Sequence, residues 1–319
     1  MSMPVLMDKH IKVINSKYRC VSPKQFLYSI AIVRLASNLS YTYACGDFCN
    51  GLLILAACMC VEVICPACYS LLSLCFPLLM AMHAVYLQDK TMISLRQTML
   101  LMPITIGFIG IPMSICLHRF FSHQAFATSR GMHAVFAIVS CLAFQGGPLW
   151  WAVMHARHHK NCDKEDDPHS ISKDGFWYSF LGWTVNPSNY RIDVHSLQPG
   201  VCFPETQVIQ KIHNIFPVLL CLLVCHHNGY ACMLWSVLIP MLMCRLITLL
   251  FNLEFHPAIV DEKQCKSIND DRFLAKIVGE SRHEDHHKTP RRSRRPDWDL
   301  AYFATLYWMK PLGLVWDCR

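Results

Sequence analysis

The sequence has little charge and lacks the marks of secretion and of nucleic-acid binding. Only 16% of its 319 residues are charged and 53% are hydrophobic, whereas about 25% of a soluble globular protein is charged. Several charged residues precede the first long apolar run, so we expect no signal peptide. No basic run alternates with aromatic residues, so we expect no nucleic-acid partner. This composition favours a membrane protein.

The 18 cysteines lack the spacing of a metal-binding or disulfide framework. Many lie inside apolar runs, and no pair of CxxC motifs is present. We therefore expect buried free thiols that behave as small hydrophobic side chains.

The apolar runs predict an all-α integral membrane protein with four transmembrane helices. About 20 residues cross a bilayer as a helix, and the predicted spans lie at about 66–87, 99–117, 212–225 and 231–251. Residues 51–65 extend the first run and are expected to be embedded or interfacial, with a tight hairpin near Cys65 and Pro66 as the alternative. Residues 1–50 form a cytosolic or interfacial segment before the main domain at 51–319.

Basic residues predict the orientation. With four crossings, residues 1–50, 118–211 and 252–319 share one side of the membrane. The two opposite loops are short and hold only Lys90 and Arg96, so the basic side is expected to face the cytosol. The two larger blocks would then form a helical cytosolic cap.

One apolar stretch of this cap is interrupted. Residues 131–152 contain a Gly-Gly-Pro sequence followed by Trp150 and Trp151. Paired tryptophans suit a membrane interface. We expect a helix near the membrane surface, with a further crossing as the alternative.

Three histidine clusters lie in the expected cap. Two have HxxHH spacing and a looser pair follows the second span; their members are His118, His123, His155, His158, His159, His283, His286 and His287. Positions i, i+3 and i+4 share one face of a helix, so each HxxHH presents three imidazoles in one direction. With 17 histidines in the chain, one HxxHH would arise by chance in roughly 0.05 of such chains. The clusters therefore predict a metal site.

The number of imidazoles predicts two ions, because one tetrahedral ion takes four ligands. His256 is a ninth candidate, with Asn252 four residues earlier on the same helical face. Nitrogen ligands suit iron, zinc or copper, so spacing alone does not choose the metal. Ligating imidazoles usually donate their other N–H to an acceptor such as a carboxylate, and among the acidic residues beside the clusters we expect this role for Asp166, Asp167 and Glu280.

These motifs resemble those of the membrane fatty-acyl desaturases. His118 and His123 match the HxxxxH box of that family, and the two HxxHH clusters match its other boxes. Neighbouring sequences resemble the acyl-CoA branch, of the Δ9 or stearoyl-CoA type, at residues 145–151, 155–160, 166–170, 175–177, 279–280 and 312–317. Asn252 and His256 match a further ligand motif of that branch, and the resemblance runs from about residue 99 to 319.

The resemblance implies an oxygen-dependent acyl-CoA desaturase, an oxidoreductase of unsaturated fatty acid biosynthesis. It implies two irons held by the nine histidines, with Asn252 acting through water. Electrons are expected from a separate cytochrome b5 and its NADH-dependent reductase, since no haem-binding segment is visible. The expected location is the endoplasmic reticulum, with the site facing the cytosol. The expected contacts to a fatty acyl-CoA are Trp150, Trp151, Arg157, Lys160 and Arg191.

Departures from the family pattern occur at Gln124, Arg282 and Asp285, where a basic residue, Trp and Asn are common. None removes a ligand. The alternatives are a desaturase or hydroxylase that acts on a sphingoid base or a phospholipid-bound acyl chain, and a non-catalytic metal-binding membrane protein or transporter. Transport favours ionisable residues within the spans, and the apolar runs hold few.

Overall fold

A computed structural model describes residues 95–190, 192–193, 197, 200–258, 265–294 and 299–319. The predicted segments 1–50 and 51–65, the first predicted span at 66–87, and Arg191 lie outside these residues.

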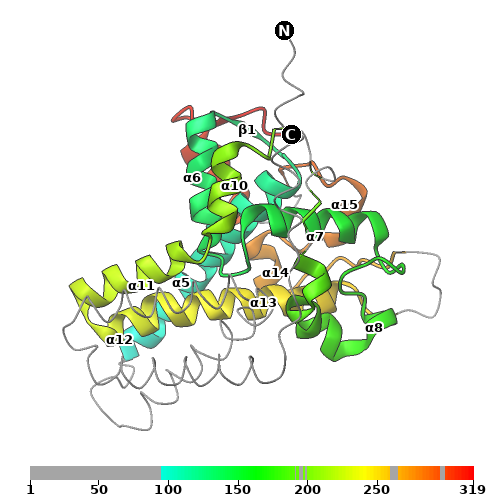
Figure 1. The fold of residues 1–319 in the computed structure, drawn as a ribbon, viewed down its shortest axis with the longest axis horizontal. Helices are drawn as coiled ribbons and strands as arrows, with labels where there is room; N and C mark the ends of the chain where they lie inside the picture. Colours follow the sequence, from blue (N-terminus) through cyan, green and yellow to red (C-terminus); the bar gives the residue numbers. More distant parts are fainter. Residues whose placement is uncertain (1–94, 191, 194–196, 198–199, 259–264, 295–298) are drawn as a thin grey trace.

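The described chain is mostly helical (Figure 1). Its elements in chain order are α5 (Leu95–Phe108), η1 (Ile109–Ser122), β1 (Ala127–Thr128), α6 (Arg130–Cys141), α7 (Pro148–Asn161), α8 (Ile171–Trp177), η2 (Tyr178–Gly182), α9 (Trp183–Val185), η3 (Pro187–Tyr190), α10 (Pro204–Lys211), α11 (Ile215–Asn228), α12 (Tyr230–Met233), η5 (Leu234–Leu238), α13 (Ile239–Phe255), α14 (Phe273–Val278), α15 (His283–Lys288), α16 (Leu300–Ala304), η6 (Thr305–Met309) and β2 (Val315–Trp316). The helical segments η1, η2, η5 and η6 have wide, π-helical turns. β1 and β2 pair antiparallel, with Ala127 opposite Trp316.

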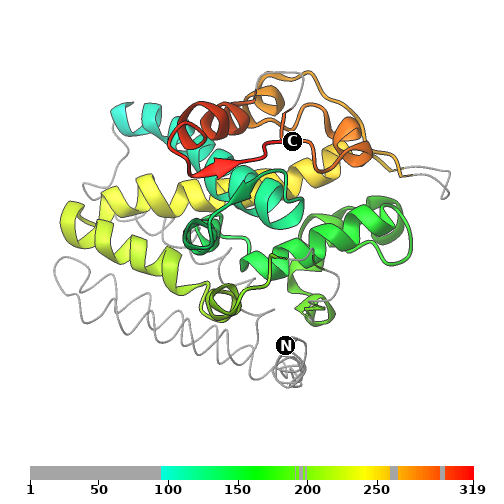
Figure 2. The same cartoon turned by 90° about the horizontal axis from the view of Figure 1, so that it is seen from above.

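The helices form a long apolar layer and a second group that lies over one end of it. In the long layer, α5 packs against α13, and α11 packs against α12 and η5. Figure 1 shows α6, α7, α10 and α15 on one side of this layer, and Figure 2 looks down on the molecule from that side. The second group carries most of the histidines predicted to bind metal.

Two helical stretches are long and apolar enough to cross a membrane: Leu100–Ser122 and Tyr230–Phe255. They overlap the predicted spans at 99–117 and 231–251. The α10–α11 pair also meets this test, but a bend of 64° makes it a broken span or a re-entrant pair. Between α11 and α12 the chain turns at Gly229, whose φ of +84° favours glycine, where the sequence predicted a short turn.

The stretch predicted as one interfacial helix at 131–152 is two helices, and its tryptophans are buried. α6 and α7 are separated by a break that includes Gly146, with φ +87°. Trp150 and Trp151 are only 5% and 7% exposed, so the expectation that they mark a membrane interface is wrong. Trp150 can be buried because its ring N–H donates to the carbonyl of Asn189 at 2.8 Å.

A buried ion pair joins the first candidate span to the C-terminal helices. Arg119 Nη2 donates to Asp299 Oδ2 at 2.7 Å, and the two side chains are 2% and 1% exposed. Gly279, with φ +78°, lies against this pair, and a Cβ there would be 2.5 Å from Asp299 Oδ1. Only glycine fits this close approach, which fixes the position of the next residue, Glu280.

Breaking the ion pair should destabilise the fold. Removing one partner leaves a buried charge uncompensated, so we expect Asp299→Ala to cost about 3–5 kcal/mol of unfolding free energy. The measurement is the thermal unfolding midpoint in detergent. The matched control is Glu205→Gln, because the pair of Glu205 with Arg130 is 28% and 65% exposed and such pairs contribute little. Equal shifts in both variants would contradict this role for the buried pair.

Candidate metal centre

Helix α7 carries the second histidine box. Its start is fixed by Gly147 and Pro148 in the chain and by Gln210 of α10, which packs against it. Pro148 is its first residue and follows Gly147, and proline at this position needs no N–H partner. The next two N–H groups, of Leu149 and Trp150, donate to Gln210 Oε1 at 2.9 and 3.0 Å. A Cβ on Gly147 would lie 2.6 Å from Gln210 Cδ, so a side chain there would displace this cap.

The nine histidines identified from the sequence converge in two groups. The first group has four members whose ligand atoms lie within 4.8 Å of one another, His118, His123, His155 and His286, and a fifth that contacts two of them at 3.0 Å, His159. The second group has three mutually close members, His158, His256 and His287, and a fourth that contacts two of them at 3.0 and 3.2 Å, His283. We call these the five-histidine group and the four-histidine group.

The spacing of the Nε2 atoms fits metal ligation. Facing Nε2 atoms lie 2.9–3.2 Å apart. His286 Nε2 faces both His118 and His159, although one imidazole nitrogen carries either one proton or one lone pair. Ligands about 2.1 Å from an ion are about 3.0 Å apart at right angles and about 3.4 Å apart in a tetrahedron. The observed spacing is therefore short enough for several imidazoles to share one ion.

Acidic side chains meet ring nitrogens that face away from the two groups. His118 Nδ1 lies 3.1 Å from Glu280 Oε1, and His158 Nδ1 lies 3.0 Å from Asp167 Oδ1. Such partners fix the tautomer and orientation of a ligating imidazole. Asp167 and Glu280 therefore lie where the prediction needs them. Asp166 was predicted to have the same role, but its side chain is exposed to solvent.

Burial keeps the clustered imidazoles neutral. Desolvation, followed by repulsion from neighbouring histidines, holds the pKa of His155, His158, His159 and His256 well below its usual value. For His287, desolvation and then the charge of His283 lower the pKa to about 2. Metal ligation requires the neutral form, so these side chains are ready to bind at pH 7.

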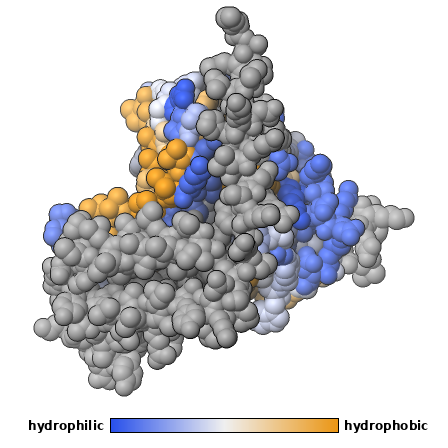
Figure 3. Space-filling model, in the orientation of Figure 1, coloured by the Kyte–Doolittle hydropathy of each residue, from blue (hydrophilic) through white to orange (hydrophobic). Residues whose placement is uncertain are grey.

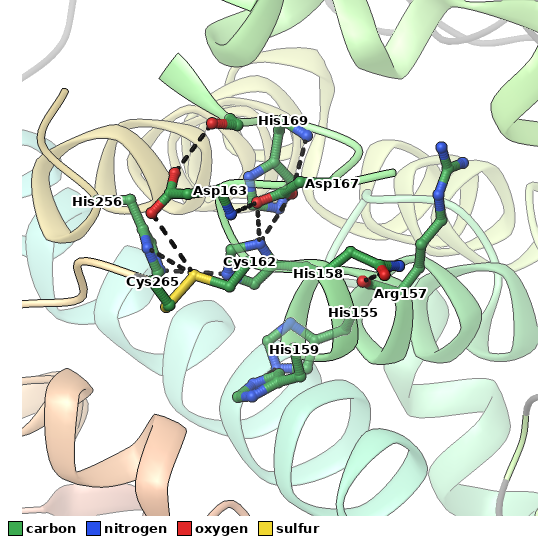
Figure 4. A network of polar contacts seen from close by, with 12 residues as sticks. His155, Arg157, His158, His159, Cys162, Asp163, Asp167, His169, His256 and Cys265 are labelled. Carbon is green, nitrogen blue, oxygen red and sulfur yellow. Dashed lines mark hydrogen bonds and ion pairs between the residues drawn. A yellow bond between two sulfur atoms is a disulfide. The ribbon is translucent and has the colours of Figure 1, made fainter. Parts of the chain in front are cut away.

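A disulfide that the sequence did not indicate lies beside the four-histidine group (Figure 4). Cys162, the C-cap of α7, is bonded to Cys265. The expectation of free thiols holds for the buried residues Cys116 and Cys244 and is wrong for this pair. Both paired cysteines lie in polar stretches and are 103 positions apart, so only folding brings them together.

A cavity extends from the histidines between the apolar helices. Its lining includes Ile109, Met113 and Phe251 on the apolar side, and His155 and Asn252 on the polar side. Histidine side chains therefore lie at the wall of a mostly apolar cavity.

Among the predicted substrate contacts, Trp151 lines this cavity, whereas Trp150 is packed among other aromatic rings. Arg157 is tied to the protein, since its Nε donates to the carbonyl of Asp166 at 2.6 Å. Lys160 is exposed at the end of α7, and Arg191 lies outside the described residues.

Three polar residues of the cavity, Gln145, His169 and Thr248, were not assigned from the sequence. His169 stacks on His158, with ring centroids 4.4 Å apart, and Gln145 Nε2 donates to Thr248 Oγ1 at 2.9 Å. All three line the cavity. Signals for them existed: His169 and Gln145 lie within the sequences that carried the family resemblance, and Thr248 is one helical turn before Asn252.

Comparison with known proteins agrees with this geometry. A relative named sn-1 stearoyl-lipid 9-desaturase, from Anabaena variabilis, is 28% identical over 217 residues, which are 66% of this chain and 79% of the relative. Delta-9 acyl-lipid desaturase 1 from Arabidopsis thaliana is 27% identical over 230 residues, which are 67% of this chain and 72% of the relative. A probable acyl-CoA desaturase from Schizosaccharomyces pombe is 27% identical over 234 residues, which are 66% of this chain and 48% of the relative.

The family described as fatty acid desaturase matches residues 97–306, which is more than half of the chain and includes every histidine of the two groups. The resemblance seen in the histidine boxes is thereby confirmed, and this chain belongs to the fatty acid desaturase family.

Proposed function

We propose that this protein is an oxygen-dependent di-iron desaturase that introduces a double bond into a fatty acyl-CoA. Its electrons would come from cytochrome b5 and the NADH-dependent reductase of that protein. The observation that carries the proposal is the convergence of nine histidines in two groups beside an apolar cavity. Two ions fit these groups, and Asn252, which lines the cavity, would act on one of them through water.

The chain's own residues would position the substrate and exclude water. Methylene C–H bonds offer no handle for acid–base chemistry, and two irons with O2 would supply the oxidant. Since all methylenes are chemically alike, the cavity must select the carbon pair by position. The apolar wall would exclude water. The hydrogen bond from Gln145 to Thr248 would hold these two polar side chains in place on that wall. Glu280 and Asp167 would hold the ligand rings.

We also propose the four-crossing topology, with residues 118–211 and 252–319 as a cytosolic cap at the endoplasmic reticulum. The surface supports an orientation of this kind. Figure 3 shows hydrophobic residues over α6 and α11, and hydrophilic residues at the opposite end of the molecule. Val135 and Ile138 on α6, with Leu219 and Leu223 on α11, are each more than a third exposed. Lipid would cover these side chains.

A lipid-bound acyl chain is the second candidate substrate, because two of the relatives are named as lipid desaturases. The described surface supports CoA through exposed arginines that follow the third box, Arg291, Arg292 and Arg294. Guanidinium groups suit the phosphates of CoA.

Product analysis should identify the reaction. We expect expression in a desaturase-deficient host to yield monounsaturated acyl chains, detected by mass spectrometry. Purified protein with the donor system should convert acyl-CoA faster than phospholipid-bound chains. Faster conversion of the phospholipid would replace the first candidate by the second, and a hydroxylated product would contradict desaturation.

Removing one ligand from each group should remove metal and activity. We expect His155→Ala and His158→Ala each to lose about one iron per chain and nearly all turnover, because each imidazole has a place in one group. Membrane insertion should persist. The control is His226→Ala, in the exposed last turn of α11, which should keep both irons. Full metal content in either ligand variant would remove that histidine from the site.

Metal retention should not change near pH 6.5, where a free imidazole gains a proton. An unfolded imidazole has a pKa of about 6.5, and burial lowers the pKa of His155 and His158 well below that in the folded chain. Below about pH 6.5 the unfolded chain thus binds more protons, so stability falls as the pH drops. Metal content, measured after gel filtration, should stay constant from about pH 8 to pH 6. Loss of metal with a midpoint near 6.5 would contradict this.

A further inference from the structure

The two histidine groups differ in what meets their outer ring nitrogens. In the four-histidine group, two of these nitrogens meet sulfur instead of carboxylate. His256 Nδ1 lies 3.6 Å from Cys162 Sγ, and His287 Nδ1 lies 3.7 Å from Cys265 Sγ. The two sulfurs belong to one disulfide (Figure 4). A single covalent bond therefore holds the partners of two imidazoles of one group.

The segments that carry the two cysteines are also held together without that bond. The carboxylate of Asp163, next to Cys162, accepts the N–H of Lys266, next to Cys265, at 3.1 Å. The same carboxylate accepts Ser170 Oγ at 2.9 Å. After reduction the two sulfurs would therefore stay close, and the bond could form again.

Access to the two sulfurs is unequal. Cys162 is 4% exposed, whereas Cys265 is exposed. A small oxidant or a thiol reductant can therefore reach Cys265 from the solvent. On a cytosolic surface, a disulfide is usually catalytic or redox-sensing and not permanent.

We propose that Cys162 and Cys265 form a reversible thiol/disulfide site, oxidised by peroxide, whose state sets how firmly the four-histidine group holds its metal. This inference rests on the proposed function, because it takes the group to be a metal site. The disulfide state clamps the segments that follow the second box and precede the third. The dithiol state leaves only hydrogen bonds between them.

The oxidation balances with one peroxide per disulfide. The Cys265 thiol is first oxidised by hydrogen peroxide to a sulfenic acid, with release of one water. The Cys162 sulfur then attacks the Cys265 sulfur, the S–S bond forms, and a second water leaves. Two thiols thus lose two protons and two electrons, and the peroxide O–O bond is cleaved. A small dithiol such as dithiothreitol reverses the change by exchange.

The state of the pair should change metal retention. A disulfide sulfur has no S–H, and the covalent bond fixes both sulfurs against His256 and His287. Mutation of groups that orient ligands typically weakens metal binding about 10–100-fold, and reduction, which keeps both sulfurs but frees them to move, should have an effect at the low end of that range. We therefore expect reduction to weaken iron at the four-histidine group about 10-fold and to leave the five-histidine group unchanged.

The test uses full-length, iron-loaded protein in detergent. Samples treated with dithiothreitol or hydrogen peroxide are alkylated, and mass spectrometry reports the state of Cys162 and Cys265. Iron is then counted after a timed exposure to a chelator. We expect the oxidised protein to keep about two irons per chain and the reduced protein about one, as two separate groups predict.

Variants separate the proposal from its alternatives. Cys265→Ser should release iron like the reduced wild type in both treatments, and the control Cys202→Ser should respond like the wild type. Wild-type protein alone decides the case if a variant fails to fold. A pair that never alkylates after dithiothreitol, equal iron release in both states, or uptake of an added Zn²⁺ by the dithiol would overturn the proposal. Protein that binds no iron in either state would instead refute the proposed function.

Discussion

Nine imidazoles, each fully or partly buried, converge with facing Nε2 atoms 2.9–3.2 Å apart, and this crowding is the constraint on which the rest of the structure depends. Neutral nitrogens at this distance cannot all form hydrogen bonds with one another. Protonated, they would repel in a region where burial already disfavours charge. One cation in each group would satisfy the facing lone pairs, and metal binding would then be coupled to the folding of this region.

The surrounding structure holds these rings from several distant parts of the chain. Gln210 caps the first turn of α7 and so fixes where this helix, which carries the second box, begins. Gly279 allows the chain to pass the buried pair of Arg119 and Asp299, and so delivers Glu280 to His118. The ion pair of Arg119 and the contact of Glu280 with His118 thus both depend on Gly279. Structural and chemical roles are joined in this segment.

The two histidine groups are not equivalent. In the five-histidine group a carboxylate lies against the outer nitrogen of His118. In the four-histidine group a carboxylate lies against that of His158, and sulfurs lie against those of His256 and His287. Carboxylates can only accept hydrogen bonds at neutral pH, but sulfurs can exchange an S–H for an S–S bond. Family membership accounts for the histidine boxes.

The sequence by itself identified the histidines that converge, because HxxHH spacing places three imidazoles on one helical face wherever that helix packs. It also predicted the apolar helices near 99–117 and 231–251, since length and composition decide whether a helix can span a bilayer. Only the tertiary structure decided the division into five and four histidines, the burial of Trp150, and the pairing of Cys162 with Cys265. These depend on contacts between segments far apart in the chain, where no local periodicity carries a signal.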